Sequence, residues 1–191
     1  MVDTDWTLPL FRSPTQAKLL TRLIVEPESE PQSLTALADS TGIPLSTVQR
    51  EVNTLERAGL VSSHRIGNTR LVSANRESPY YRDLASLLLT AFGPKAVLSA
   101  ALRRVPRIDE AHIYGSWARR YLGDESEPPR DIDVLVIGEP PPRAVYSAAR
   151  RAEEDLNIEV NPVLASPDEW ATPRGLLRRI KSGPLVELDV V

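Results

Sequence analysis

The chain has 191 residues, a formal net charge of -3 and 41% hydrophobic residues, so it is long enough for one ordinary domain or two small ones. It contains no cysteine, which excludes a disulfide framework and a cysteine-ligated zinc site and favours a cytoplasmic location. The acidic start at residues 1–5 does not resemble a secretory signal, and no run approaches the roughly 20 apolar residues of a membrane span, so we expect no membrane partner.

The first third of the sequence predicts three helices followed by a two-stranded ribbon. Leucine and isoleucine at helical spacing indicate a helix over residues 19–24, which ends at a Glu-Pro pair. A short helix over residues 34–40 ends at a Thr-Gly turn, and a third helix over residues 44–58 begins with proline. Residues 60–64 and 69–73 predict two strands joined by an Ile-Gly-Asn turn. This order of elements is that of a winged helix-turn-helix.

The third predicted helix has a polar face that carries no carboxylate. Amide, hydroxyl and guanidinium groups can hydrogen-bond base edges and phosphates when such a helix enters the DNA major groove. The ribbon turn adds further polar side chains where a wing would contact the backbone or the minor groove. Although the whole chain is acidic, residues 41–70 carry four arginines against two glutamates. The candidate DNA-binding residues are Ser46, Thr47, Gln49, Arg50, Asn53, Arg57, Arg65, Asn68 and Arg70.

Residues 14–75 resemble the winged-helix regulators of the ArsR and MarR kind. The resemblance rests on the sequences SLTALA from residue 33, STVQREV from residue 46 and LERAGLV from residue 55, and on the turn at residues 65–70. It implies binding to double-stranded DNA, usually as a dimer. Winged helices also serve as protein-interaction modules, and the sequence leaves that alternative open.

Residues 78–105 predict two apolar helices separated by Gly93 and Pro94. We expect this segment to be a helical linker between a winged-helix domain at residues 1–77 and a second domain at residues 106–191. Its apolar stripe either packs on a second copy of the chain, which would give a homodimer, or covers the neighbouring domain.

The last part of the chain alternates between strand and helix patterns. Expected strands cover residues 111–114, 132–137 and 158–164, expected helices cover residues 116–122 and 144–156, and a final helix begins at Ser166. This alternation predicts an α/β domain with a small mixed sheet. The whole chain is therefore expected to be of the α+β class.

Two aspartates at the start of a predicted strand suggest a cation site. Asp131 and Asp133 are two residues apart and project from the same side of a strand, where like charges repel and a Mg²⁺ ion would be favoured. Gly115 and Ser116 lie where a strand meets a helix, a position suited to holding an anion. An Asp-x-Asp alone is more often a solvated strand end, but a phosphate-binding turn beside an acid pair is typical of nucleotidyl transfer.

Residues 95–190 resemble the minimal nucleotidyltransferases of the DNA polymerase β superfamily, through the Gly-Ser-x-Ala-Arg turn at residue 115 and the Asp-Ile-Asp at residue 131. The resemblance implies that Gly115 and Ser116 contact the phosphates of a nucleoside triphosphate and that Asp131 and Asp133 bind Mg²⁺ (or Mn²⁺). It leaves Arg119 either assisting a phosphate or serving a structural role.

The sequence departs from that family at the position of a third carboxylate. The best alignment places Asn161 there, and an amide cannot accept a proton. Glu159 is two residues away and either substitutes as a third catalytic acid beside Asp131 and Asp133 or is a solvent-facing residue.

Two functions follow from these patterns. The first is a DNA-binding regulator whose second domain binds nucleotide and Mg²⁺ with reduced or no activity. The second is an active metal-dependent nucleotidyltransferase that modifies a protein, RNA or small-molecule hydroxyl, in a toxin–antitoxin setting with a partner protein.

Overall fold

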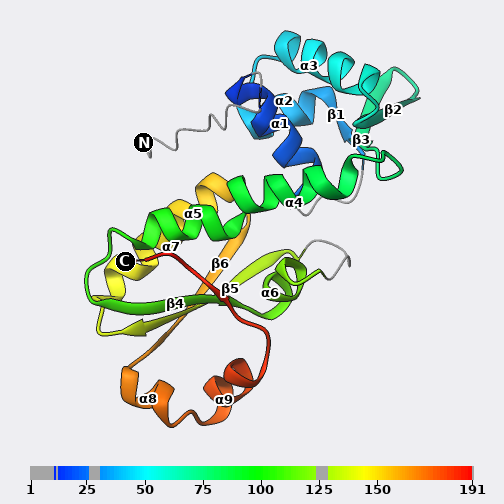
Figure 1. The fold of residues 1–191 in the computed structure, drawn as a ribbon. Coiled ribbons are helices and arrows are strands. Elements are labelled where there is room, and N and C mark those ends of the chain that lie inside the picture. Colours follow the sequence, from blue (N-terminus) through cyan, green and yellow to red (C-terminus); the bar gives the residue numbers. More distant parts are fainter. Residues whose placement is uncertain (1–10, 12, 26–30, 124–128, 191) are drawn as a thin grey trace. The chain divides into compact units, whose positions relative to one another are not determined.

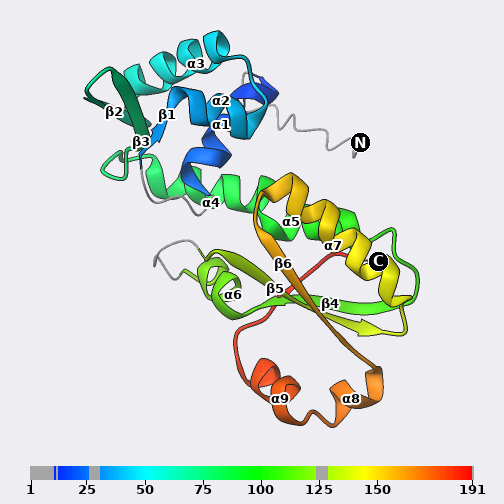
Figure 2. The ribbon, with the colours of Figure 1, turned by 180° about the vertical axis from the view of Figure 1, so that it is seen from behind.

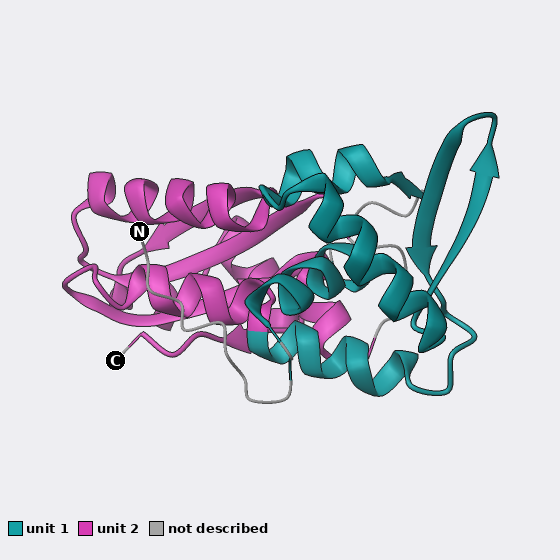
Figure 3. Cartoon of the chain, turned by 90° about the horizontal axis from the view of Figure 1, so that it is seen from above, with its two compact units in different colours: residues 1–91 teal, residues 92–191 magenta. Residues whose placement is uncertain are grey.

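The computed structural model describes residues 11, 13–25, 31–123 and 129–190. The chain forms two compact units, residues 1–91 and residues 92–191, which Figure 3 shows in different colours. Each unit has its own small sheet, so the chain is of the mixed α+β class. The expected helical linker at residues 78–105 is not a separate unit, because the boundary falls inside it. The expected end of the first helix at residues 26–27 and the acidic start of the chain lie outside the described residues.

The first unit begins with three helices, as the apolar periodicity predicts. They are α1 (Pro14–Ile24), α2 (Leu34–Thr41) and α3 (Leu45–Arg57). Serine side chains cap the first two: the Ser13 hydroxyl accepts from the Gln16 N–H, and the Ser33 hydroxyl accepts from the Ala36 N–H. Gly42 ends α2 in the left-handed conformation, with φ +66°, which makes the tight turn into α3.

A three-stranded antiparallel sheet completes the winged-helix arrangement. Its strands are β1 (Gln32–Ser33), β2 (Val61–Ile66) and β3 (Thr69–Ala74), in the order β1-β3-β2. The β2–β3 hairpin closes at the pair Ile66 and Thr69, which leaves Gly67 and Asn68 as its turn. The predicted two-stranded ribbon is therefore present but incomplete, because β1, a strand of only two residues, was not foreseen.

The apolar segment after the wing forms two helices, α4 (Tyr81–Phe92) and α5 (Pro94–Leu102), which Gly93 separates. The stretch Tyr81–Leu102 is long and apolar enough to cross a membrane by length and composition alone, contrary to the expectation from sequence. This is weak evidence for a span, because α5 is a core helix of the second unit that packs against α7 (Pro142–Leu156). The α5 half of the stripe is therefore used within the chain, and the homodimer stays a prediction.

The second unit is built on a four-stranded mixed sheet with helices on both sides (Figures 1 and 2). Its strand order is β6-β5-β4-β7, in which β5 and β6 are parallel and the other neighbours are antiparallel. The mixed sheet confirms the prediction, whereas α9 and β7 were not foreseen. In addition to α5 and α7, the elements are β4 (Ile108–Tyr114), α6 (Gly115–Tyr121), β5 (Asp131–Gly138), β6 (Glu159–Ala165), α8 (Pro167–Ala171), α9 (Gly175–Ser182) and β7 (Val186–Glu187).

The two faces of this sheet are covered by different helices. Helices α5 and α7 lie on one side, and α8 and α9 lie on the other (Figure 1). Leu135 and Ile137 of β5 pack with Ile180 of α9 in one apolar cluster. Because side chains alternate along a strand, Asp131 and Asp133 project from this same face, beyond the edge of the cluster. The fold thus places the acid pair at the open end of a face whose other end is covered.

Candidate functional site

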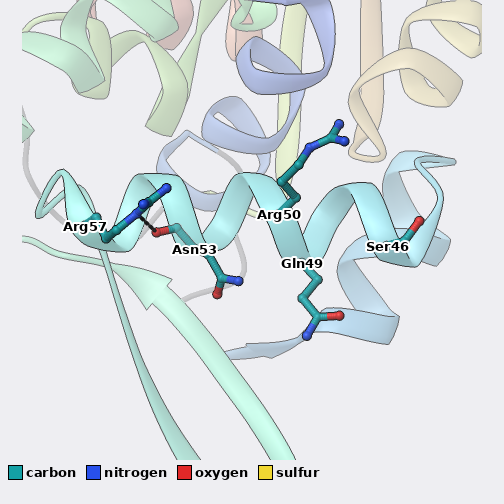
Figure 4. Close-up of a pocket in the computed structure, with 5 residues that line it drawn as sticks. All are labelled: Ser46, Gln49, Arg50, Asn53 and Arg57. Atoms are coloured by element: carbon teal, nitrogen blue, oxygen red, sulfur yellow. Dashed lines mark hydrogen bonds between the residues drawn. The ribbon is translucent and has the colours of Figure 1, made fainter.

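Helix α3 separates a buried face from a polar one. Val48, Val52 and Leu55 are at most 2% exposed and anchor the helix in the first unit. The opposite face is exposed, and five of its side chains border a shallow hollow along the helix (Figure 4). None of the five is a carboxylate, so the surface suits an anionic ligand. They are Ser46, Gln49, Arg50, Asn53 and Arg57, all predicted to contact DNA. Thr47, also predicted, is half-buried at the edge of this face.

The start of α3 leaves backbone donors available. Pro44 occupies the cap position without a side-chain hydrogen bond, and its carbonyl accepts from the N–H groups of Thr47 and Val48. The N–H groups of the first two helical residues, Leu45 and Ser46, have no intrahelical acceptor by the geometry of an α-helix. Such groups at a helix N-terminus can bind a phosphate oxygen.

Arg57 and Arg70 are both held by neighbouring groups. The Nε of Arg57 donates to the Asn53 carbonyl at 3.3 Å, so this guanidinium lies along its own helix (Figure 4). Arg70 of β3 donates to the Asn53 side-chain oxygen at 2.7 Å, to the Glu56 carboxylate at 2.7 Å and to the Ser63 hydroxyl at 3.1 Å. The hydroxyl of Ser63 also donates to Glu56.

Arg70 therefore links the wing to α3, and only 18% of its side chain is exposed. Arg65 and Asn68, at the tip of the hairpin, are exposed. We refer to Arg70, Glu56, Ser63 and Asn53 as the wing clamp. Sequence reasoning found Arg70 and Asn53 but missed Glu56 and Ser63, because their contacts depend on the register of the hairpin.

Three helices, an antiparallel hairpin and an exposed acid-free face on the third helix define a winged helix-turn-helix of the DNA-binding class. Residues 24–65 match the IclR helix-turn-helix domain, which supports a DNA-binding transcription regulator. The match is to the IclR kind and does not single out the ArsR or MarR regulators suggested by the sequence. No curated protein matches the chain. The contacts of individual residues stay predictions.

The second candidate site lies at the start of β5. The register pairs Asp133 with Tyr114 of β4 on one side and with Asn161 of β6 on the other. Asp131 pairs with Glu159. Because paired residues project from the same face, the sheet gathers these five polar side chains at one end. Sequence reasoning had placed all of them except Tyr114, which it treated only as part of the strand before Gly115.

Gly115 is fitted closely to Asp133. Its φ is +70°, and a Cβ added there would lie 2.7 Å from an Asp133 carboxylate oxygen. Only glycine allows both the backbone conformation and this approach. Ser116 is exposed, and its hydroxyl accepts from the Arg119 guanidinium at 3.1 Å on the surface of α6. The strand-to-helix turn therefore lies beside Asp133 and leaves no room for a side chain at residue 115.

The acid pair is electrostatically unfavourable when nothing cationic is bound. Burial, followed by the nearby charge of Asp131, raises the pKa of Asp133 above its ordinary value. Burial raises the pKa of Tyr114 in the same way, with smaller contributions from the charges of Asp133 and Asp131. A cation beside the two carboxylates would reverse these effects.

The donor set fits a cation held by two carboxylates and not by three. Asn161 donates its side-chain N–H to the Asp131 carboxylate at 3.2 Å, so the amide lies beside the pair. Glu159 is exposed, and within residues 13–25, 31–123 and 129–190 no three acidic or histidine side chains come close enough to hold a metal. The three-acid cage that would give Glu159 a catalytic role is therefore not formed there. Mg²⁺ commonly binds through one or two carboxylates together with substrate phosphates, which is compatible with Asp131 and Asp133.

Proposed function

We propose that this regulator reads a specific double-stranded DNA site with α3 and the wing, and that its second unit binds a nucleoside triphosphate with Mg²⁺ while retaining little or no transfer activity. The observation that carries the DNA-binding part is the exposed acid-free face of α3 within a matched helix-turn-helix domain. Regulation by the bound nucleotide would then connect the two units functionally.

The side chains of α3 suggest a division of roles on DNA. Gln49 carries an amide that suits adenine, and Arg50 carries a guanidinium that suits guanine in the major groove. The side-chain oxygen of Asn53 accepts from Arg70, which leaves its N–H donors for a base. Ser46 and Thr47, beside the open N–H groups of the first turn, suit a phosphate. Contacts from the remaining predicted residues would go to the backbone or the minor groove. These residues are Arg57, Arg65, Asn68 and Arg70, the last of which also links the wing to α3.

Selection from a pool of random duplexes tests the DNA-binding proposal. The full chain is expected to enrich one sequence, with an affinity that falls as salt rises. Arg50→Ala is expected to weaken binding to that sequence by about 1–3 kcal/mol, because a bidentate base contact would be lost. Arg143→Ala, on the exposed surface of α7, is the matched control. The proposal fails if no sequence is enriched.

The nucleotide-binding part is supported by the contact between Gly115 and Asp133 and by the acid pair. Asp131 and Asp133 would hold Mg²⁺ (or Mn²⁺), which would neutralise phosphate charge, and the turn at Gly115 and Ser116 would receive a phosphate. Arg119, whose guanidinium donates to the Ser116 hydroxyl, would assist a phosphate. Asn161 stands where a third acid was expected, and because it cannot accept a proton we propose reduced or absent transfer.

An active nucleotidyltransferase is the second candidate, favoured by the close fit of the glycine turn against the acid pair. It would transfer a nucleotide to a protein, RNA or small-molecule hydroxyl, with a partner protein if the setting is toxin–antitoxin. Incubation with labelled nucleoside triphosphates, Mg²⁺ or Mn²⁺ and cell extract would then label an acceptor. The double variant Asp131→Asn/Asp133→Asn should abolish that labelling, and persistent labelling would contradict the assignment.

A further inference from the structure

Helix α9 presents an unbalanced basic surface. Arg174 at its cap, Arg178, Arg179 and Lys181 are all exposed, and residues 171–186 contain no aspartate or glutamate. The chain as a whole carries a net charge of -3, so this concentration of positive charge runs against its composition. Neither the recognition surface of α3 nor the acid pair accounts for it.

The helix is fixed to the sheet by its apolar side, which leaves the basic side chains outward. Ile180 is 4% exposed and packs with Leu135 and Ile137, and Leu177 joins the same cluster. Arg178 and Lys181 are three residues apart and lie on one side of α9, while Arg174 stands at its cap and Arg179 lies on an adjoining side. The orientation of this basic side is therefore determined by the core of the unit.

Of the four basic side chains, only that of Lys181 has a bonding partner among the described residues. Lys181 donates to the Trp170 carbonyl at 2.7 Å and lies 4.6 Å from the centre of the Trp170 ring. No hydrogen bond or ion pair engages the side chains of Arg174, Arg178 and Arg179 among the residues that the structure describes.

Helix α7 of the same unit, by contrast, carries acidic side chains that balance its positive charges. It also carries three exposed arginines, but the acidic run Glu153, Glu154 and Asp155 follows them in the same helix. Arg151 of α7 is in addition bonded to the Ser147 hydroxyl at 3.2 Å. The two helices differ in charge balance while both lie on the surface of the same sheet.

We propose that α9 is a second DNA-binding surface, which contacts the phosphate backbone of the duplex bound by the first unit. Guanidinium groups bind phosphates through paired hydrogen bonds, and several of them on one short helix suit a repeating anion. The inference rests on the proposed DNA binding of the first unit. Because both units belong to one chain, binding of the first unit to DNA raises the effective phosphate concentration around α9, so that even weak contacts are populated. The contact carries no sequence information.

The test compares two duplexes with the full-length protein. One duplex contains only the selected site, and the other has the same centre with added flanks. Wild type is expected to bind the longer duplex at least about tenfold more tightly at low salt and with a steeper salt dependence, because each extra phosphate contact adds about 0.9 to the slope of log K against log salt. Arg174→Gln/Arg178→Gln/Arg179→Gln should lose this gain and leave binding to the short duplex unchanged.

A matched variant on α7, Arg143→Gln/Arg150→Gln/Arg151→Gln, removes the same charge and should retain the gain from flanks. Circular dichroism and thermal melting of each variant verify that it is folded. Equal flank dependence in wild type and the α9 variant would overturn the inference, while specific binding to the short duplex would leave the proposed function standing. If wild type binds neither duplex specifically, the proposed function is rejected instead. An α9 variant that loses binding to a structured RNA but keeps the gain from flanks on DNA would also overturn the inference.

Discussion

The recognition surface of α3 and the acidic end of β5 arrange polar side chains in contrasting ways. The first is exposed and free of carboxylates, and all its members come from one helix. The second gathers residues from three strands and one turn, with two carboxylates on one face. Asp133 lies so near Gly115 that no side chain fits at that position. The first surface can bind an anion with little rearrangement. The second carries charge repulsion that a cation would relieve.

This contrast has a consequence for stability. The exposed side chains of Ser46, Gln49 and Arg50 can change without disturbing the core, because Val48, Val52 and Leu55 lie on the other face of α3. Changes at the acid pair affect the fold and the site together, because the contact between Gly115 and Asp133 belongs to both. Substitutions on the exposed face of α3 should therefore change binding without changing stability. Substitutions at the acid pair should change both.

The largest expected effect comes from Gly115→Ala. The added Cβ would lie 2.7 Å from the Asp133 carboxylate at a φ of +70°. We expect the free energy of unfolding to fall by about 2 kcal/mol or more, as the strain and the collision combine, and nucleotide binding to be lost. Urea denaturation and calorimetry with a nucleoside triphosphate and Mg²⁺ measure the two effects.

Gly175→Ala is the control for backbone strain alone, because Gly175 has a φ of +54° and nothing within 4 Å of an added Cβ. A smaller loss of stability in this variant would isolate the collision with Asp133. Equal losses in the two variants would show that the fit of Gly115 against the acid contributes nothing.

A smaller effect is expected in the wing clamp. Arg70→Ala and Glu56→Ala should each lower the free energy of unfolding, and the double variant should lose less than the sum by about 1 kcal/mol, because the two side chains are directly paired. Urea denaturation of the four proteins gives this coupling energy. Additive losses would mean that the pair stabilises nothing.

Measurements of DNA binding distinguish two roles of Arg70, positioning the wing and contacting a phosphate. If Arg70 serves only to position the wing, Arg70→Ala should reduce affinity while leaving the salt dependence unchanged. Arg65→Ala, at the exposed tip, should lower the slope of log K against log salt by about 1. A reduced slope in the Arg70 variant would show that this guanidinium reaches the DNA.

The smallest effect concerns the pH dependence of Asp133→Asn. Because the folded state raises the pKa of this carboxyl, ionised Asp133 destabilises the protein, and wild type loses stability as pH rises through the raised pKa. The variant should be more stable than wild type at neutral pH, by less than the roughly 1.4 kcal/mol of one pKa unit, because solvent screens a partly exposed carboxylate.

The stability difference should vanish below the pKa of the unfolded chain, where the carboxyl is protonated in both states. Urea denaturation without divalent cations at a series of pH values tests this. Wild type that is more stable than the variant at neutral pH would contradict the raised pKa.

Elements with a clear local pattern could be predicted from the sequence, and short elements could not. The stripe of Val48, Val52 and Leu55 gave α3, and the apolar run after Asp131 gave β5. Strands β1 and β7 have two residues each, too few to show a period of two. Helix α9 was missed because a single final helix was expected from Ser166, whereas the structure has two short helices there, α8 and α9.

The candidate sites differ in the same respect. The polar face of α3 follows from spacing within one helix, so five of its predicted residues appear together in the structure. The neighbours of the acid pair depend on strand register, which places Asn161 beside Asp133 and Asp131 beside Glu159. Sequence reasoning could name these residues from a resemblance, but it could not show that Asn161 bonds to Asp131 or that Glu56 holds Arg70.

The central claim, that α3 reads DNA sequence, is tested most directly by the specificity ratio of the full chain. This ratio compares affinity for the selected duplex with affinity for a scrambled duplex of equal composition at one salt concentration. We expect at least about a thousandfold preference in wild type. Gln49→Ala should reduce the preference by at least tenfold and leave the salt slope unchanged, because an uncharged amide contacts a base and not a counterion-bearing phosphate. An unchanged ratio in that variant would contradict the account.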